Sequence, residues 1–221
     1  EFMGLEDYRK IGILSFLEFK NIQPDFKKTS LHYPYTIDIK KIKQINSYAG
    51  NNHFRIGILA SSHQPNINAV KNFIKLSQNV NENINFFIAG TICNVIDVKK
   101  IIKSYQNIRI LGEIADLAEF YNNVDCVLLN YNYQNGISMK MLEAFNYEKL
   151  VIANKNTANG LKCLPDIHYV CADNLDQVKD KINSILMKKL NFLKIIKNAK
   201  DYLYMNHSKK VNLKTLINFL E

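Results

Sequence analysis

Short apolar runs alternate with amphipathic segments from residue 54 onward, and this alternation restricts the fold more than any other feature of the chain. Strands as short and apolar as these, separated by helices, must be parallel, because each helix carries the chain back across one face of the sheet. Right-handed crossovers then predict an α/β fold with a doubly wound parallel sheet. The runs expected to form strands are residues 54–60, 84–89, 107–111, 124–130, 150–153 and 168–171.

The segments between these runs show the spacing of helices, and residues 66–78 are the clearest example. A helix over residues 95–104 is expected to place Val95 in the core. Asp116 is expected to cap the short helix that follows it. From about residue 175 to residue 221 the apolar pattern predicts further helices, so the sheet is followed by C-terminal helices.

The 221 residues, of which 47% are hydrophobic, are sufficient for one large domain or for one domain with an appendage. We expect residues 51–221 to form the α/β domain, with the C-terminal helices included. Residues 1–50 are then an N-terminal extension and an interdomain connector. Within them, Pro34 biases Tyr33 away from helix, so residues 32–38 are expected to be extended.

The composition argues against several kinds of protein. The four cysteines show no CxxC pairing, which favours buried thiols and a reducing cytoplasm over a metal or redox site. No apolar stretch approaches the roughly 18 residues that a membrane span needs. The formal charge of +9 indicates an anionic partner, but nucleic-acid motifs are absent and no nucleic acid is expected. The lysines between residues 188 and 214 form either a solvated helical face or a patch for a membrane surface.

One stretch at the expected ligand-binding edge carries most of the chemistry. Ligands of doubly wound sheets bind at the carboxyl ends of the strands, and here residues 124–130 are followed by Gly136 and by a helix with Lys140 and Glu143. Glycine lets the backbone approach phosphates, and a helix N-terminus offers N–H groups and partial positive charge. Lys140 adds a full charge, and Glu143 can accept hydrogen bonds from ribose hydroxyls. The stretch predicts a site for a nucleotide diphosphate, although a solvated lysine and a dipole-stabilising glutamate are the simpler alternatives.

The order of features from about residue 54 to the end resembles the C-terminal, donor-binding domain of retaining GT-B glycosyltransferases of the group 1 type. This resemblance implies a Rossmann-like domain that forms one half of a GT-B fold. The segments that carry it are the hinge-like residues 32–38, residues 54–66 with their Pro-Asn ending, 86–90 with a closing glycine, 110–125 with glycine, Asp-Leu, Tyr121 and Val-Asp, 136–144 with glycine, lysine and Glu-Ala, and 150–161 with Gly-Leu.

The resemblance assigns roles to the residues around the predicted phosphate site. It implies that Lys140 contacts the donor pyrophosphate, that Glu143 holds the ribose, and that Gly136 lets the loop close on the phosphates. It identifies no catalytic residue. It implies no metal ion, because the helix N-terminus and Lys140 can neutralise the leaving diphosphate. It implies no cofactor either, since the nucleotide diphosphate sugar is itself the substrate.

Two further loops receive roles from the same resemblance. The backbone near Gly112 and Ile114 would meet the base, and Ser61 and Ser62 would bind phosphate. His63 lies in the same loop as the serines, but a lone loop histidine is usually uninvolved. The other histidines have no partners at metal-binding spacing and are given no role.

The sequence departs from the family pattern at three places. Asn135 stands where many relatives have a second glutamate, Ser138 stands where they often have a basic residue, and residues 146–149 lack the usual glycine. These departures keep open the alternative of a non-catalytic binding or assembly module with a decayed site. A second alternative is a basic α/β domain that docks on a membrane or nucleic acid through its C-terminal lysines.

The resemblance implies a glycosyltransferase of the hexosyltransferase type. Such an enzyme transfers a sugar from its nucleotide diphosphate to a glycan or lipid-linked acceptor, as in cell-surface polysaccharide synthesis. The roughly 50 residues before the first strand cannot form the acceptor-binding half, so we expect that half outside these residues and expect this chain to bind the donor without turnover. The expected location is the cytoplasm, and a peripheral position at the inner face of the membrane stays open as an alternative.

Overall fold

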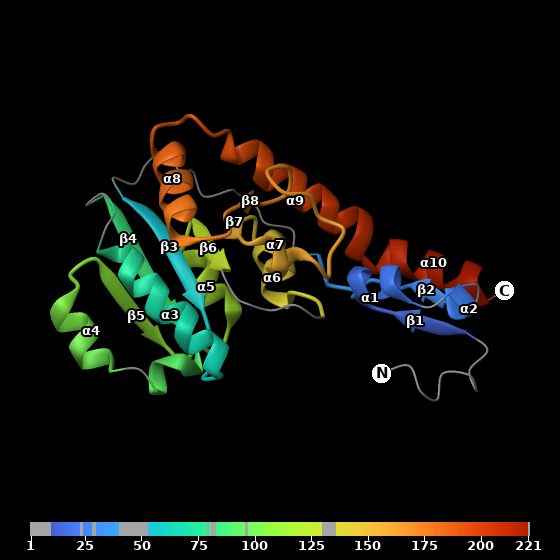
Figure 1. The fold of residues 1–221 in the computed structure, drawn as a ribbon, viewed down its shortest axis with the longest axis horizontal. Coiled ribbons are helices and arrows are strands. Elements are labelled where there is room, and N and C mark those ends of the chain that lie inside the picture. The colour runs from blue at the N-terminus through green and yellow to red at the C-terminus, as the bar shows by residue number, and fades with distance from the viewer. Residues whose placement is uncertain are drawn as a thin grey trace.

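A computed structural model describes residues 10–22, 24–27, 30–39, 53–78, 80, 83–95, 97–129 and 136–220 (Figure 1). Its main feature is a six-stranded sheet in which every strand pair is parallel and the strand order is β5-β4-β3-β6-β7-β8. The predicted doubly wound α/β fold is therefore confirmed. The strands are β3 (Phe54–Leu59), β4 (Ile84–Ala89), β5 (Ile108–Gly112), β6 (Cys126–Leu129), β7 (Leu150–Ala153) and β8 (Val170–Cys171).

Helices connect the strands and continue the chain after the sheet. Asp116 caps the helix that follows it, as predicted, because its side chain accepts a 2.9 Å hydrogen bond from the Ala118 N–H. The expected helix start near Val95 is wrong: a 3-10 helix over Thr91–Asn94 comes first, and Val95 is 53% exposed. The helices are α3 (Gln64–Ser77), α4 (Val98–Ser104), α5 (Leu117–Asn123), α6 (Met139–Asn146), α7 (Lys155–Ala158), α8 (Leu175–Leu186), α9 (Phe192–His207) and α10 (Lys209–Leu220).

The two faces of the sheet are covered by different helices. Phe73 of α3 packs edge-on against Phe86 of β4, with ring centroids 5.1 Å apart, so α3 covers one face. On the other face, Gly57 of β3 leaves room for Phe120 of α5, since a Cβ at Gly57 would lie 2.7 Å from that ring. Helices α5 and α6 lie side by side on this second face, where Tyr121 and Tyr147 stack.

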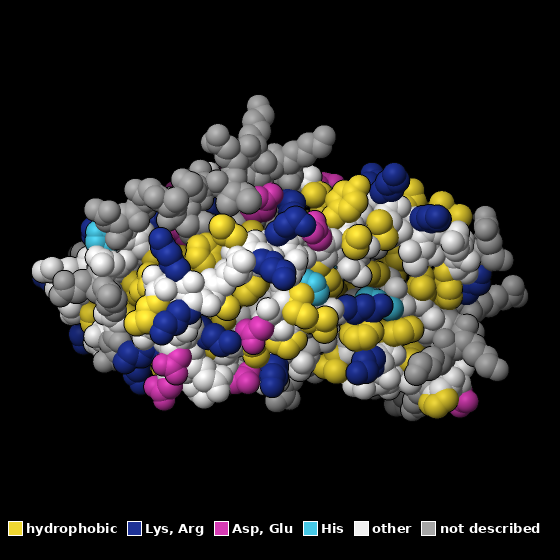
Figure 2. Space-filling view, turned by 90° about the horizontal axis from the view of Figure 1, so that it is seen from above, with side chains coloured by type: hydrophobic (Ala, Val, Ile, Leu, Met, Phe, Trp, Pro, Cys, Tyr) yellow, Lys and Arg dark blue, Asp and Glu magenta, His cyan; other side chains and the backbone are white. Residues whose placement is uncertain are grey.

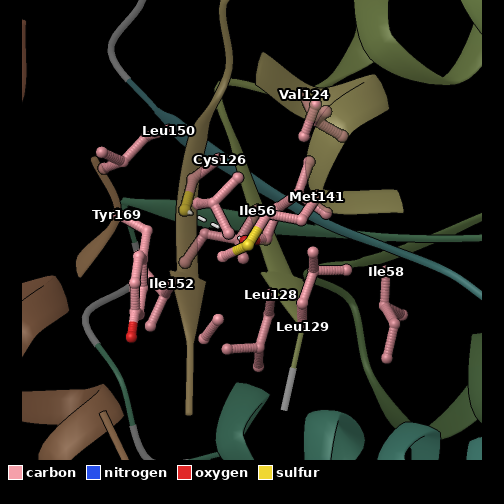
Figure 3. Packing of buried hydrophobic residues seen from close by; sticks show 14 of the residues in the cluster. Ile56, Ile58, Val124, Cys126, Leu128, Leu129, Met141, Leu150, Ile152 and Tyr169 are labelled. Carbon is pink, nitrogen blue, oxygen red and sulfur yellow. Dashed lines mark hydrogen bonds between the residues drawn. The ribbon is translucent and has the colours of Figure 1, made fainter. Parts of the chain in front are cut away.

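The core is built from the central strands and the helices against them (Figure 3). Ile56 on β3, Leu128 on β6 and Ile152 on β7 are buried, and Met141 of α6 has no exposed surface. Each such side chain contributes about 1.5–3 kcal/mol when it is fully removed from water. This burial fixes α6, and with it the segment predicted to bind phosphate, against β6 and β7 of the sheet.

The N-terminal segment forms a small unit at the end of the molecule opposite α4, beside α10 (Figure 1). Strands β1 (Ile11–Ile13) and β2 (Ser30–His32) pair in parallel, and α1 (Phe16–Asn21) and α2 (Pro24–Lys27) lie between them in the chain. A parallel pair needs such a crossover. The domain boundary expected near residue 51 falls between described segments and stays a prediction.

The connector after β2 is anchored to the C-terminal helices. The His207 ring lies 2.7 Å from the Tyr35 carbonyl oxygen, and the Ile37 N–H donates to the His207 carbonyl. The side-chain amides of Asn146 and Asn212 donate to the carbonyls of Asp38 and Pro34, both at 2.9 Å. The extended conformation predicted for this segment is held in place from three helices, α6, α9 and α10.

Candidate functional site

The strand order reverses direction between β3 and β6, which are neighbours in the sheet. Loops that leave neighbouring strands at such a reversal turn to opposite faces and leave a crevice between them, where ligands of this fold class bind. Ser61 and Ser62 follow β3, and Gly136, Lys140 and Glu143 follow β6. The structure thus brings the two predicted phosphate segments to adjacent strands.

The predicted phosphate loop leads directly into α6. Gly136 has a φ of +82°, a left-handed conformation that favours glycine. Ser138 precedes the helix without a side-chain hydrogen bond to its first turn, and its carbonyl accepts from the Met141 N–H. Asn135, the other departure from the family pattern, lies outside the described residues.

The loop after β7 supports the phosphate loop from the side. A Cβ on Gly160 would overlap the carbonyl oxygen of Gly136, so only glycine allows the two loops to approach this closely. The Thr157 hydroxyl donates a 3.0 Å hydrogen bond to the carbonyl of Leu129 at the end of β6. The sequence indicates Gly160 only through the Gly-Leu pair of the family resemblance, and its contact with Gly136 explains why glycine stands there.

Lys140 and Glu143 lie one turn apart on α6, and both are half-buried. Burial lowers the pKa of Lys140 below its ordinary value, while the nearby Glu143 carboxylate opposes that shift. Burial raises the pKa of Glu143, and a hydrogen bond from Tyr121 and the charge of Lys140 oppose that shift. The two charges therefore stabilise each other in a partly desolvated place.

The loop after β3 is also held by specific hydrogen bonds. The Asn66 side-chain amide donates to the Ser61 hydroxyl at 2.7 Å and to the Ser61 carbonyl at 3.1 Å. The Ser62 N–H donates to the Thr91 hydroxyl at 3.1 Å. Sequence reasoning selected the serines but missed Asn66, although its place in the first turn after the loop was a usable signal.

Gly112 and Ile114, the predicted base contacts, lie at the end of β5, two strands away from β3. Gly112 has a φ of +81°, and its carbonyl accepts a 2.8 Å hydrogen bond from the Gly90 N–H. Ile114 is half-buried and packs against the core. Both residues therefore lie at the carboxyl edge of the sheet, as the two phosphate segments do, but beside its outermost strand, β5.

A groove with a volume of about 370 Å³ lies beside Glu143. It is bounded by the start of α5, by one side of α6 and by the connector. A carboxylate in a partly apolar groove is suited to accept hydrogen bonds from hydroxyl groups. The residues that line it are Tyr35, Thr36, Ile37, Asp38, Leu117, Met139, Glu143, Asn146 and Tyr147.

Two of the histidines can be placed from their surroundings. His63 is exposed at the start of α3, and the ring of His168 accepts a hydrogen bond from the Leu164 N–H. Within the described part of the chain, no group of three His, Cys, Asp or Glu side chains could hold a metal ion. In the same residues, no helix is long and apolar enough to cross a bilayer.

Comparison with known families identifies the chain. The family model described as "Glycosyl transferases group 1" matches residues 53–188, which is more than half of the sequence. The chain belongs to this family. Comparison of this group 1 chain with curated proteins finds no significant match.

Solved structures agree with the family. A glycosyltransferase from Rickettsia africae ESF-5 has a TM-score of 0.73 at 15% identity, and the match covers 96% of this chain and 64% of that protein. A mutant of S. aureus TarM in complex with Fondaparinux, alpha-GlcNAc-glycerol and UDP has a TM-score of 0.73 at 14% identity, with 98% of this chain and 44% of TarM covered. Anabaena HepE in complex with UDP-glucose has a TM-score of 0.63 at 15% identity, with coverage of 76% and 49%. The fold of this group 1 chain is that of the C-terminal half of a GT-B glycosyltransferase, and it spans only part of the length of each of these proteins.

Proposed function

We propose that this chain binds the nucleotide diphosphate sugar of a glycosyltransferase. The observation that supports this most directly is the placement of Lys140 and Glu143 at the start of α6, at the reversal of strand order, with Ser61 on the neighbouring strand. In this proposal Lys140 and Ser61 contact the two phosphates, and Glu143 receives the ribose hydroxyls. Gly112 and Ile114 would meet the base from the end of β5.

The proposed chemistry needs charge stabilisation of the leaving diphosphate. Positively charged donors that are already in place stabilise such a group as charge develops on it. Lys140 and the first turn of α6 would supply this stabilisation without a metal ion. We accordingly expect the affinity for a nucleoside diphosphate to be the same in EDTA and in magnesium, whereas a loss of binding in EDTA would assign the role to a metal.

Titration calorimetry of the purified chain with UDP, GDP, ADP and CMP tests the proposal. Selective binding of one diphosphate that is lost in Glu143→Ala would support it and identify the base. Glu119→Ala is the matched control, because Glu119 is an exposed glutamate in the first turn of α5. If the chain binds none of the four nucleotides, the alternative of a binding or assembly module with a decayed site is favoured. Ser138, which stands where relatives often have a basic residue, would agree with that alternative.

The whole enzyme would transfer a hexose to a glycan or lipid-linked acceptor in the synthesis of a cell-surface polysaccharide. In this proposal the acceptor is bound by another half, outside these 221 residues. The support is that the match to this chain covers only 44% of TarM and 64% of the Rickettsia protein. HepE and TarM are described in complex with UDP-glucose and UDP, which makes UDP the first nucleotide to test.

We also propose that the protein works at the cytoplasmic face of a membrane that contains anionic lipids. The supporting observation is the exposed side of α10, a helix without acidic residues, in which lysines alternate with apolar side chains. Figure 2 shows a face of the molecule over which lysine and hydrophobic side chains are intermixed. The exposed residues that define this α10 surface are Lys209, Lys210, Leu213, Lys214, Ile217 and Leu220.

A further inference from the structure

A buried tyrosine on α5 reaches the candidate site from inside the core. Tyr121 has no exposed surface, yet its hydroxyl lies 3.3 Å from Glu143 Oε2 and 3.5 Å from the Lys140 carbonyl oxygen. A phenylalanine would fill the same space in the core without a polar atom. Packing of the core therefore does not require the hydroxyl, which lies beside the two residues that we propose bind the donor.

The Tyr121 ring is held so that its hydroxyl has little freedom. Tyr147 stacks on it with a centroid distance of 4.4 Å and an interplanar angle of 14°, and Phe120 packs edge-on at 5.1 Å. Because the hydroxyl lies in the plane of a ring fixed on two sides, its position relative to α6 is set by packing. A group fixed in this way can orient a neighbour without losing conformational entropy when a ligand binds.

The contact acts on one oxygen of the Glu143 carboxylate. Tyr121 donates to Oε2 at 3.3 Å, which restrains this oxygen and leaves Oε1 and the remaining lone pairs of Oε2 for other donors. A carboxylate restrained in this way can accept from two adjacent hydroxyls at once, as a ribose 2′,3′-diol presents them. The groove beside Glu143 has room for such a group.

The hydrogen bond also favours the ionised carboxylate. Burial alone raises the pKa of Glu143, and the Tyr121 hydrogen bond and the Lys140 charge lower it. The ionised form accepts hydrogen bonds with both oxygens, whereas the protonated form uses one oxygen as a donor. The same contact thus selects both the orientation and the charge state that a diol needs.

We propose that Tyr121 is a positioning residue that fixes the Glu143 carboxylate for the 2′,3′-diol of the donor ribose, and so sets the preference of the site for ribonucleotides. This inference rests on the proposed function, since it assumes that Glu143 meets the ribose. It adds a residue that does not touch the nucleotide and acts through another.

Tyr121→Phe tests the proposal, because it removes the hydroxyl and keeps the stacked ring. The measurement is the affinity for UDP and for 2′,3′-dideoxy-UDP, or for the corresponding pair if another base is preferred. We expect the affinity for the ribonucleotide to fall about ten- to a hundredfold and the affinity for the dideoxy analogue to stay the same, given the strength of a hydrogen bond to a charged group. Tyr202→Phe is the control, because Tyr202 is a buried tyrosine of α9 whose hydroxyl accepts from the Lys162 N–H.

The outcomes separate this inference from the proposed function. If the wild-type chain binds no nucleoside diphosphate, the proposed function is refuted and the role of Tyr121 with it. If the wild type prefers the ribonucleotide and Tyr121→Phe keeps the same preference, only the role of Tyr121 is refuted. In a Glu143→Gln background, Tyr121→Phe should cause no further change in the preference.

A second measurement needs no ligand. NMR titration of the Glu143 carboxyl carbon should show a higher pKa in Tyr121→Phe than in the wild type, because the ionised form loses a hydrogen bond. A core effect that merely loosened α5 would expose Glu143 to water and move its pKa down. An unchanged or lowered pKa would overturn the proposal.

Discussion

The side-chain amide of Asn66 in α3 holds the hydroxyl of Ser61 at 2.7 Å, at the point where β3 ends. Because Asn66 donates to the oxygen of Ser61, the hydroxyl proton of Ser61 is directed away from Asn66. The serine is in this way prepared to donate to a third group in the crevice. Ser61 and Asn66 together form one half of the candidate phosphate site.

We expect Asn66→Ala to weaken the binding of a nucleoside diphosphate about three- to tenfold, the size of one neutral hydrogen bond. Calorimetry on Asn66→Ala, Ser61→Ala and the double variant checks this, and the losses should not add because both variants affect one donor. Asn72→Ala, an exposed change on the same helix, is the control. Additive losses would show that Asn66 does not act through Ser61.

Lys140→Ala should weaken nucleoside diphosphate binding by about 1.5–3 kcal/mol, because it removes a charge-assisted contact to the phosphates. A nucleoside without phosphates should bind the variant and the wild type equally. The matched control is Lys100→Ala, an exposed lysine of α4. Unchanged diphosphate affinity in Lys140→Ala would remove the phosphate assignment.

The parts of the fold that were predicted correctly depend on local signals. Strands β3 to β7 are apolar runs that end at loops, and their pattern can be read within a window of a few residues. The error at Val95 has a local cause as well: Asp97 caps α4 by accepting from the Lys100 N–H at 2.9 Å, and this capping residue was visible in the sequence. The 3-10 helix before it has no comparable signal.

The contacts that build the site join residues far apart in the chain. Tyr121 meets Glu143 across 22 positions, and His207 meets Tyr35 across 172. Such contacts follow from the packing of α5 on α6 and of the connector on α9. The periodic spacing of apolar residues in the sequence does not predict this packing. The motif could therefore indicate Lys140 and Glu143. Tyr121 stands in a segment that carries the family resemblance, but its contact with Glu143 became visible only in three dimensions.

Gly160→Ala should disturb the phosphate loop, because the added methyl group overlaps the Gly136 carbonyl oxygen. We expect a loss of about 1–3 kcal/mol of stability, the usual cost of overpacking, and weaker nucleotide binding. Thermal denaturation and calorimetry measure the two effects. Gly12→Ala is the control, since the nearest atom to its added Cβ, on Tyr33, is 3.9 Å away. Nucleotide binding at wild-type affinity in Gly160→Ala would show that the two loops need not touch.

Acid should destabilise the contact between the N-terminal unit and the domain. Burial, followed by the charge of Lys162, lowers the pKa of His32 to about 4, and burial also lowers the pKa of His207. An unfolded histidine titrates near 6.5, so the unfolded chain binds protons first and the free energy of unfolding falls as the pH decreases from about 6.5 toward 4.

The midpoint of thermal unfolding should accordingly fall between pH 7 and pH 5. In His32→Gln, which cannot titrate in this range, the fall should be smaller by about 2–4 °C. His63→Gln, a change at an exposed histidine, should follow the wild type. Equal pH dependence in His32→Gln and the wild type would show that His32 does not contribute.

The α10 surface should bind vesicles that contain anionic lipids. Each lysine near such a surface contributes about 1 kcal/mol, so Lys210→Gln combined with Lys214→Gln should weaken the binding about 30-fold. Sedimentation with vesicles of phosphatidylcholine and phosphatidylglycerol measures this, and high salt should release the protein. Ile217→Ser should weaken the binding at all salt concentrations, because it removes an apolar contact. The control replaces Lys71 and Lys75, two exposed lysines of α3, with glutamine. If this control pair weakens binding as much as the α10 pair, the attraction comes from the net charge of the protein and not from α10.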